Sequence, residues 1–311
     1  MTEANGESYD HGGVGLIELF DDVWRSKLFV IVGTSVIAVI AILVSLSMEN
    51  IYRAEALLIS NEKQSSTGLA GLQGQYGALA SLAGIDLGAD GSDGLQAGLA
   101  VLSSKKFVFD FIDRRELLVP LMAGKSWDAA TQTLVIDNEI YDQELNKWIR
   151  DVRPGRSVVP TLQEAYEEFT DRFSFSKNDE TGLMRLAFES VSPVMSKQWV
   201  DWLVEDINQT ILAQDVSRAE RAIEYLNEQI RSTPLTELKS VLFRLVEDQT
   251  RTLMLARISD EYLLRTIDPA IVPEKKVKPV RSIIVLAAVF FGGGFLALIV
   301  IVRGIIRRQR S

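Results

Sequence analysis

Two long stretches of the chain are apolar and contain no charged residue. They are Leu28–Met48 and Ser282–Val302, near the two ends of the 311-residue sequence. As a helix, each is long enough to cross a hydrocarbon core of about 30 Å at about 1.5 Å per residue. Buried core helices are usually shorter and keep a polar stripe. The pattern therefore predicts two transmembrane helices, at 28–48 and 282–302. No A-x-A-like cleavage site follows the first, so we expect an uncleaved anchor.

Basic residues beside the apolar runs predict their orientation. Arg25 and Lys27 precede the first run, and four arginines follow the second. Lys and Arg near the ends of a transmembrane helix are retained in the cytoplasm, whereas a long loop crosses largely regardless of its charge. We therefore expect a cytoplasmic arm at 1–27, a cytoplasmic tail at 303–311 and an outer domain at 49–281. The spacing of apolar residues in Gly15–Lys27 favours either an interfacial amphipathic helix or the start of the first transmembrane helix.

Strand patterns mark the first part of the outer domain. Ile51–Ser60 is typical of a strand. Arg172–Lys177 and Leu183–Ser190 alternate apolar and polar residues around a turn that contains Gly182, which is a β-hairpin signal. We therefore expect these three segments to be strands, with a hairpin between the last two.

Helices and one loop are predicted between these strands. The glycines of Gln64–Gly94 defeat a continuous helix, so this segment is predicted as loop with a helical turn or two. Leu95–Arg114 is predicted as one helix, and Thr161–Phe169 as a short helix with a capping box of Thr161 and Glu164. Scattered aromatic residues between 117 and 168 favour core packing, with a sugar-binding platform as the alternative.

A long helical pattern begins at Ser192 and continues to about Arg231. Ser192 is a favourable N-cap and the next residue is proline, which suits the first helical position. Pro234 ends this helix, and a second helix, capped by Thr233, is predicted over about Leu235–Tyr262. Forty residues of helix extend roughly 60 Å, so we expect a helical hairpin or a bent stalk.

The outer domain is thus predicted to have three parts. Residues 51–191 form an α/β base, residues 192–262 form the long helices, and residues 263–281 form a proline-rich return that runs as an edge strand or a polyproline segment. The fold class we expect is an α+β membrane protein, in which two transmembrane helices flank this outer domain.

Common catalytic chemistry has little support in the composition. His11 is the single histidine and the chain has no cysteine, which argues against a metal site and against Ser-His-Asp or Cys-His catalysis. No nucleotide-binding glycine motif is present. The net charge of −9 disfavours nucleic acid as a partner. We expect no catalytic, cofactor-binding or metal-binding residues, with a membrane-bound glycan hydrolase using paired carboxylates as the enzyme alternative.

The second apolar run and its approach carry two further features. Small residues spaced by four around Gly292–Gly294 favour close helix packing. Lys275, Lys276, Lys278 and Arg281 precede the run and are candidate contacts for lipid phosphates. Interfacial anchoring by the long basic side chains is the alternative explanation for these four residues.

Two segments resemble a known family. IELFDDVWRSKLFVI, which leads into the first apolar run, is similar to the start of Wzz-type chain-length determinants, also called polysaccharide co-polymerases. LVEDQTRTLMLARISDEYLLRTIDPAIVPEKKVKPVRSIIVLAAVFFGGG resembles the family's C-terminal signature. The glycines here are consecutive rather than spaced by four. By this resemblance the motif for membrane approach and helix packing comprises Pro269, Pro273, Pro279, Arg281, Gly292, Gly293 and Gly294.

The resemblance implies a function without catalysis. Family members of this kind lack a fused kinase, place an α/β domain with a long helix in the periplasm, and assemble as homo-oligomers in the bacterial inner membrane. The assembly sets the length of an O-antigen, capsule or exopolysaccharide, which a Wzy-type polymerase makes from undecaprenyl-linked units. A separate cytoplasmic tyrosine kinase or an outer-membrane export protein is a further partner to consider. The alternative role is that of an inner-membrane adaptor in polysaccharide export.

Overall fold

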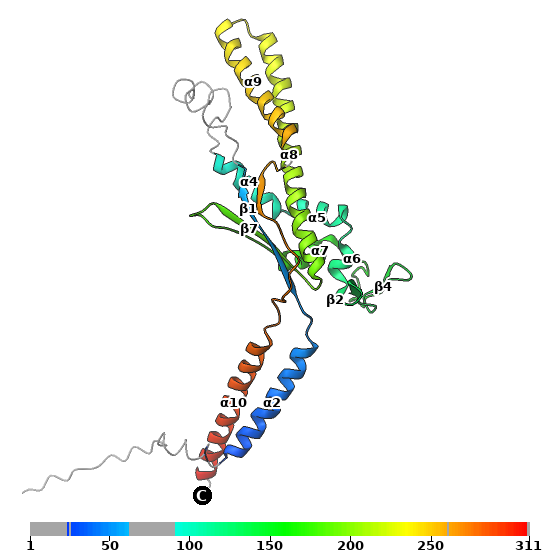
Figure 1. Ribbon diagram of the computed structural model, residues 1–311, viewed down its shortest axis with the longest axis vertical. Coiled ribbons are helices and arrows are strands. Elements are labelled where there is room, and N and C mark those ends of the chain that lie inside the picture. The colour runs from blue at the N-terminus through cyan, green and yellow to red at the C-terminus, as the bar shows by residue number, and fades with distance from the viewer. Residues whose placement is uncertain (1–23, 25, 62–90, 260, 310–311) are drawn as a thin grey trace, which may run out of the picture. The chain divides into compact units, whose positions relative to one another are not determined.

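The computed structural model describes residues 24, 26–61, 91–259 and 261–309, which form two compact units (Figure 1). One unit contains the described parts of 1–50 and 278–311, and the other contains those of 51–277. The helical prediction for Gly15–Lys27 and the loop prediction for Gln64–Gly94 fall almost entirely outside the described residues. The two units are described separately below.

The first unit is a pair of apolar helices, α2 (Lys27–Ser47) and α10 (Arg281–Gln309). They pack against each other in antiparallel directions, since Gly33 faces Leu296 while Gly292 faces Ile37. Both are long and apolar enough to cross a membrane. Most of their large apolar side chains are exposed, which suits a lipid environment better than water. The two predicted membrane-spanning helices are therefore present as helices within one residue of their predicted starts.

The second unit is built on a four-stranded antiparallel sheet. Its strand order is β6 (Phe173–Lys177), β7 (Leu183–Ser190), β1 (Tyr52–Ser60) and β8 (Leu264–Asp268). β1 pairs with β7 along its whole length, from Tyr52 opposite Ser190 to Ile59 opposite Leu183. β6 and β7 form the predicted hairpin, and Gly182 has φ +69° in its turn. All three predicted strands are confirmed.

Helix α8 (Pro193–Ser232) covers one face of this sheet and completes the core. Trp199 of α8 packs on Phe188 of β7, with ring centroids 4.8 Å apart. β1 contributes alternate residues to the same core because successive side chains point to opposite faces of a strand. The fully buried side chains around this contact include Leu58, Met184, Leu186, Leu203 and Ile207.

Four shorter helices complete the base: α4 (Gly91–Leu102), α5 (Lys105–Arg114), α6 (Leu118–Met122) and α7 (Leu162–Arg172). The prediction of one continuous helix over Leu95–Arg114 is wrong. The chain turns at Ser103–Ser104, and the Ser104 hydroxyl accepts a hydrogen bond from the N–H of Phe107 at 3.2 Å, which starts a new helix. The capping box of Thr161 and Glu164 at the start of α7 is confirmed.

Two small hairpins extend from the base. They are β2 (Gly124–Asp128) with β3 (Thr133–Ile136), and β4 (Tyr141–Asp142) with β5 (Lys147–Trp148). Tyr141 and Trp148 meet edge to face, with ring centroids 5.0 Å apart, and Trp148 is buried. These two aromatic residues therefore pack the second hairpin, as the core interpretation predicted.

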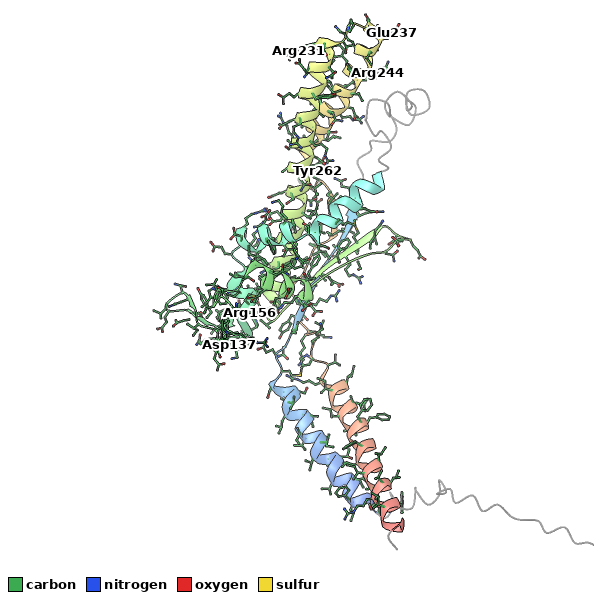
Figure 2. All side chains as sticks on the ribbon, turned by 180° about the vertical axis from the view of Figure 1, so that it is seen from behind. Asp137, Arg156, Arg231, Glu237, Arg244 and Tyr262 are labelled. Carbon is green, nitrogen blue, oxygen red and sulfur yellow. The ribbon has the colours of Figure 1, made fainter. Side chains whose placement is uncertain are left out.

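The long helices form a hairpin, in which α9 (Thr236–Ile258) runs back along α8 (Figure 1). Ser192 caps α8 and Pro193 follows it, as predicted. Two predicted helix boundaries were wrong. Thr233 ends α8 instead of capping α9, since its N–H donates to the Gln229 carbonyl. α9 ends at Ile258 rather than Tyr262, because Tyr262 turns into the core near the base of the hairpin (Figure 2).

Candidate functional site

The junction between α8 and the return strand depends on one buried amide. The side-chain oxygen of Asn208 accepts hydrogen bonds from the N–H groups of Leu263 and Leu264, at 2.7 and 2.9 Å. Its side-chain nitrogen donates to the Leu264 carbonyl at 3.0 Å. Asn208 is only 3% exposed. A buried backbone group without a partner is costly, so this amide fixes the start of β8 against α8.

A second contact joins the segment after α9 to α8. The hydroxyl of Tyr262 donates to the carboxylate of Asp215 at 2.9 Å. Burial, and then this hydrogen bond and the negative charge of Asp215, raise the pKa of Tyr262. Both causes favour the neutral phenol. The contact therefore ties the end of the α9 region to the middle of α8.

A buried carboxylate joins α8 to α5. Asp206 has no exposed surface, and its oxygen Oδ1 accepts from Arg115 Nη2 at 2.6 Å. Arg114 lies 3.5 Å from the other oxygen, and Arg115 also stacks on the ring of Trp202 at 5.1 Å. The hydrogen bond to Asp206 is the largest cause of the raised pKa of Arg115. Asp206 is thus a paired structural charge.

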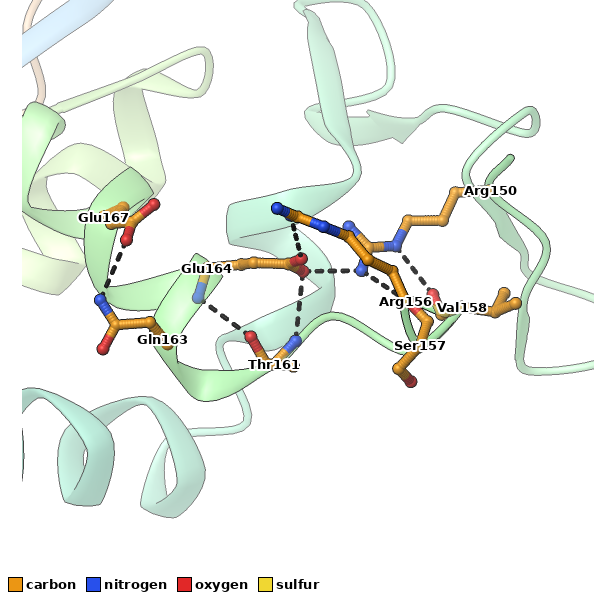
Figure 3. A network of polar contacts seen from close by, with 8 residues as sticks. All are labelled: Arg150, Arg156, Ser157, Val158, Thr161, Gln163, Glu164 and Glu167. Carbon is orange, nitrogen blue, oxygen red and sulfur yellow. Dashed lines mark hydrogen bonds and ion pairs between the residues drawn. The ribbon is translucent and has the colours of Figure 1, made fainter. Parts of the chain in front are cut away.

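A fourth polar cluster surrounds Glu164 at the start of α7 (Figure 3). Its carboxylate accepts from Arg150 at 2.6 Å, and Arg156 lies 3.5 Å away. The hydrogen bond from Arg150 is the main reason why the pKa of Glu164 is lowered. Arg150 also donates to the carbonyls of Ser157 and Val158. The cluster therefore fastens the segment after β5 to α7.

Carboxylates stabilise the turn of the first small hairpin and the turn that connects the two hairpins. Asp128 accepts from the N–H of Ala130, and Asp137 accepts from the N–H of Glu139. These hydrogen bonds are the largest causes of the lowered pKa values of the two carboxylates.

A glycan hydrolase of the usual type needs one carboxyl group with a raised pKa. Among the described residues, each carboxyl group with a resolved shift has a lowered pKa. Those residues also contain no group of three potential metal ligands.

The proline-rich return follows directly from β8. Pro269 is the first residue after the strand and is exposed, while Pro273 is half-buried. The N–H of Val277 donates to the Ile51 carbonyl at 2.8 Å, so the return segment closes beside the start of the strand β1. Lys275 is exposed and Lys276 is half-buried.

The remaining predicted residues belong to the helical unit. Lys278 is exposed and Pro279 is buried, and Arg281 begins α10. Arg281 Nη2 donates to the side-chain oxygen of Asn50, three residues beyond the end of α2, at 3.4 Å. This bond joins the chain just after the first apolar helix to the start of the second.

The three consecutive glycines of α10 have different surroundings. A Cβ atom on Gly292 would lie 2.9 Å from two side-chain atoms of Ile37, and one on Gly293 would lie 3.3 Å from Thr34 Oγ1. At Gly294 no atom lies within 4 Å of this position. Gly292 and Gly293 therefore face α2, and Gly294 faces away, because consecutive residues of a helix are 100° apart.

The sequence analysis did not identify several contacts of the structure. Gly33 of α2 is as close-packed as Gly292, since a Cβ there would lie 2.6 Å from Leu296 Cδ1. A glycine within the first apolar run was the available signal. Asn208 and Asp206 flank Ile207 of the apolar stripe of α8. Polar residues at buried helix positions were the signal there, but their partners lie far away in the sequence.

Comparison with known proteins gives one match to a protein family. Residues 13–106 match the Wzz family, described as chain length determinant protein. This region begins ahead of α2 and ends in the first turn of α5. No curated protein matches the chain.

Two solved structures are similar to the chain at low identity. A full-length bacterial polysaccharide co-polymerase is 14% identical, with 96% of this chain and 100% of that chain covered and a TM-score of 0.41. A fragment of WzzB, a polysaccharide co-polymerase from Salmonella Typhimurium, is 9% identical, with 74% and 100% covered and a TM-score of 0.31. The match of residues 13–106 confirms the predicted resemblance of this chain to the Wzz family of chain length determinants.

Proposed function

We propose that this protein is a non-catalytic, oligomeric scaffold of the bacterial inner membrane, which regulates the chain length of a surface polysaccharide. The match of residues 13–106 to chain length determinants carries the proposal. The polysaccharide would be an O-antigen, a capsule or an exopolysaccharide that a Wzy-type polymerase builds from undecaprenyl-linked units. The protein's partners are then the polymerase, the growing glycan and further copies of the chain.

The polar clusters of the second unit support a role without catalysis. Hydrogen bonds to neighbouring elements of the fold are formed by the side chains of Asp206, Glu164 and Asn208. Polar groups that are engaged in this way hold the fold together and are not directed toward a substrate. We infer that the shape of the assembly, rather than a reactive site, acts on the glycan.

The proposed topology places both termini in the cytoplasm and the second unit in the periplasm. It is supported by two helices long and apolar enough to span a membrane and by the basic residues that flank them. Reporter enzymes fused within the exposed turn at Asn178–Gly182 and after Ser311 would test it. Activity of a periplasmic reporter at the first site and of a cytoplasmic reporter at the second is expected.

The motif residues would serve the approach to the membrane and the packing of its helices. Pro269, Pro273 and Pro279 keep the return extended, Arg281 joins α10 to Asn50, and Gly292–Gly294 lie in α10. Lys275, Lys276, Lys278 and Arg281 would contact lipid phosphates or the pyrophosphate of a lipid carrier. Charge reversal at all four is expected to alter the product length, and an unchanged length with intact assembly would contradict the carrier contact.

The decisive experiment is a size profile of the surface polysaccharide from a strain without the gene and from the same strain with the gene restored. Loss of a modal length, with glycan still made, is expected in the deletion strain. Polymer that accumulates inside the cell would instead indicate an export adaptor. An unchanged profile would overturn the proposed function.

A further inference from the structure

A groove of about 530 Å³ lies between α8 and the end of α9, within the second unit. Its volume falls in the range of ligand sites, which is about 300–1,000 Å³. Residues three or four positions apart share one face of a helix, and five such residues form the α8 wall. They are Glu205, Gln209, Leu212, Val216 and Glu220.

The opposite wall comes from the end of α9 and the residue that follows it. It consists of Leu253, Ala256, Arg257 and Ser259. Across both walls the apolar lining residues are buried or half-buried, while the charged residues and the amide are exposed. The groove therefore has an apolar floor between polar rims.

Two polar groups of the α8 rim are held in place by neighbours. The amide nitrogen of Gln209 donates to Glu205 at 3.2 Å, and the other oxygen of Glu205 accepts from Arg115 at 2.7 Å. Arg115 in turn stacks on the ring of Trp202 at 5.1 Å. This arrangement leaves the carbonyl oxygen of the Gln209 amide available as an acceptor. A group that is already oriented loses less entropy when it binds a ligand.

The other rim groups retain their full hydrogen-bonding capacity. Within the described part of the chain, the side chains of Glu220 and Arg257 form no hydrogen bond or ion pair. One is an acceptor and the other is a donor of several hydrogen bonds. An anionic ligand would lie beside the carboxylate of Glu220, and a cationic ligand beside the guanidinium of Arg257. The mixed rim therefore suits a neutral ligand that both donates and accepts hydrogen bonds.

Sugar residues have this chemistry. Their hydroxyl groups donate and accept around the edge of the ring, and their C–H groups form apolar faces that can pack on the floor of the groove. We propose that the groove between α8 and α9 binds a short run of uncharged sugar residues of the surface polysaccharide. The inference rests on the proposed function and names the place where each copy of the chain contacts the glycan.

A binding measurement with two matched triple variants tests the proposal. The polysaccharide of the unmodified strain is freed from its lipid by mild acid and immobilised, and the full-length chain in lipid nanodiscs is passed over it. The groove variant combines Gln209→Ala, Glu220→Ala and Arg257→Ala. We expect its Kd to rise about tenfold or more, since each hydrogen bond contributes roughly a factor of 2 to 10 in affinity.

The control variant removes the same three residue types from exposed positions outside the groove. It combines Gln214→Ala, Glu224→Ala and Arg251→Ala, so both variants have the same composition and net charge. The control is expected to bind like the unmodified chain. Equal affinities of the two variants, or no binding by the unmodified chain, would overturn the proposal.

Size-exclusion chromatography of the same samples tests a different occupant. We expect the groove variant to keep the oligomeric state of the unmodified chain. Dissociation of the groove variant alone would show that another copy of the chain occupies the groove, which would also overturn the proposal.

The groove and the proposed function can fail separately. A modal length that depends on the gene, together with a groove variant that binds as tightly as the control, would remove the groove and leave the function. Binding that is lost only in the groove variant, together with an unchanged polysaccharide profile in the deletion strain, would do the reverse.

Discussion

Arg115, which directly follows α5, donates at 2.6 Å to Asp206 of α8, a carboxylate with no exposed surface. The two residues are 91 positions apart, so the pair links distant parts of the chain. Removing one partner of a buried ion pair leaves a desolvated charge without compensation, whereas replacing both by apolar side chains is often tolerated. This asymmetry makes the pair a sensitive probe of how α8 is held on the base.

We expect Arg115→Met to lower the free energy of unfolding by about 3–5 kcal/mol, because Asp206 loses its main partner. The double variant Arg115→Met with Asp206→Leu should be less destabilised than the single one. Denaturant unfolding of the solubilised full chain, followed by circular dichroism, measures both. Glu205→Gln is the control, since Glu205 is half-exposed and pairs with the same arginine. The Glu205→Gln variant should lower the free energy of unfolding by less than about 1 kcal/mol. Equal costs for Arg115→Met and Glu205→Gln would contradict the role of the buried pair.

The buried amide of Asn208 leads to a prediction about hydrogen exchange in β8. Asn208→Leu has a similar volume but leaves the N–H groups of Leu263 and Leu264 and one carbonyl without a side-chain partner. Each unsatisfied buried group costs about 1–3 kcal/mol. Faster hydrogen exchange is expected in peptides that cover β8, measured by mass spectrometry. Gln209→Leu, at the exposed neighbouring position, should leave that exchange unchanged. Unaltered protection of β8 in Asn208→Leu would show that the amide does not hold the strand.

These residues show where prediction from the sequence stops. Ser192, Thr161 and Gly182 act on neighbours within a few positions, so the caps and the hairpin turn were predictable. The strands β1, β6 and β7 and the two long helices followed from similar local patterns. Asp206 and Asn208 depend instead on partners tens of positions away, which no local pattern identifies.

The two wrong helix boundaries have different origins. The apolar spacing continues past Ile258, but Tyr262 leaves the helix because it is buried against α8 and bonded to Asp215. At Ser103–Ser104 two chain directions are compatible with the same apolar spacing, and the Ser104 cap selects the turn. For the candidate site, the sequence shows the three consecutive glycines, but it does not show which of them face the other apolar helix. Only the packing of α2 on α10 distinguishes Gly292 from Gly294.

Glu164 predicts how stability depends on pH. Its pKa in the folded protein lies below the ordinary value of 4.5. The unfolded chain therefore binds a proton first as the pH falls, so the stabilisation is complete above about pH 4.5 and decreases as the pH falls toward the folded-state pKa. Glu164→Gln keeps an oxygen for the Thr161 N–H and removes only the charge. We expect it to be less stable than the unmodified chain at pH 7, with a difference that shrinks below pH 4.5.

Thermal unfolding of the solubilised chain between pH 7 and pH 3.5 measures this difference. Glu167→Gln removes the same charge from an exposed position on the same helix, outside the arginine cluster (Figure 3). It should give a small difference without this dependence on pH. If the difference in unfolding temperature between Glu164→Gln and the unmodified chain stays constant with pH, the ion pair is not the cause of that difference.

Gly292 and Gly294 provide a matched pair for testing helix packing. Gly292→Leu places side-chain atoms where Ile37 already lies, whereas Gly294→Leu extends into open space. Overpacking costs about 1–3 kcal/mol, so Gly292→Leu should lower the unfolding temperature of the chain in lipid nanodiscs. Gly294→Leu should leave it nearly unchanged. Both variants add the same apolar side chain to α10, so hydrophobicity and helix propensity change equally.

A compensating change separates a local clash from a general defect. Ile37→Ala removes the atoms closest to position 292 and should restore part of the unfolding temperature lost in Gly292→Leu. It should not improve Gly294→Leu. If the two leucine variants unfold at the same temperature, or if Ile37→Ala affects both alike, the close approach of α2 and α10 at Gly292 does not contribute to the stability of the helix pair.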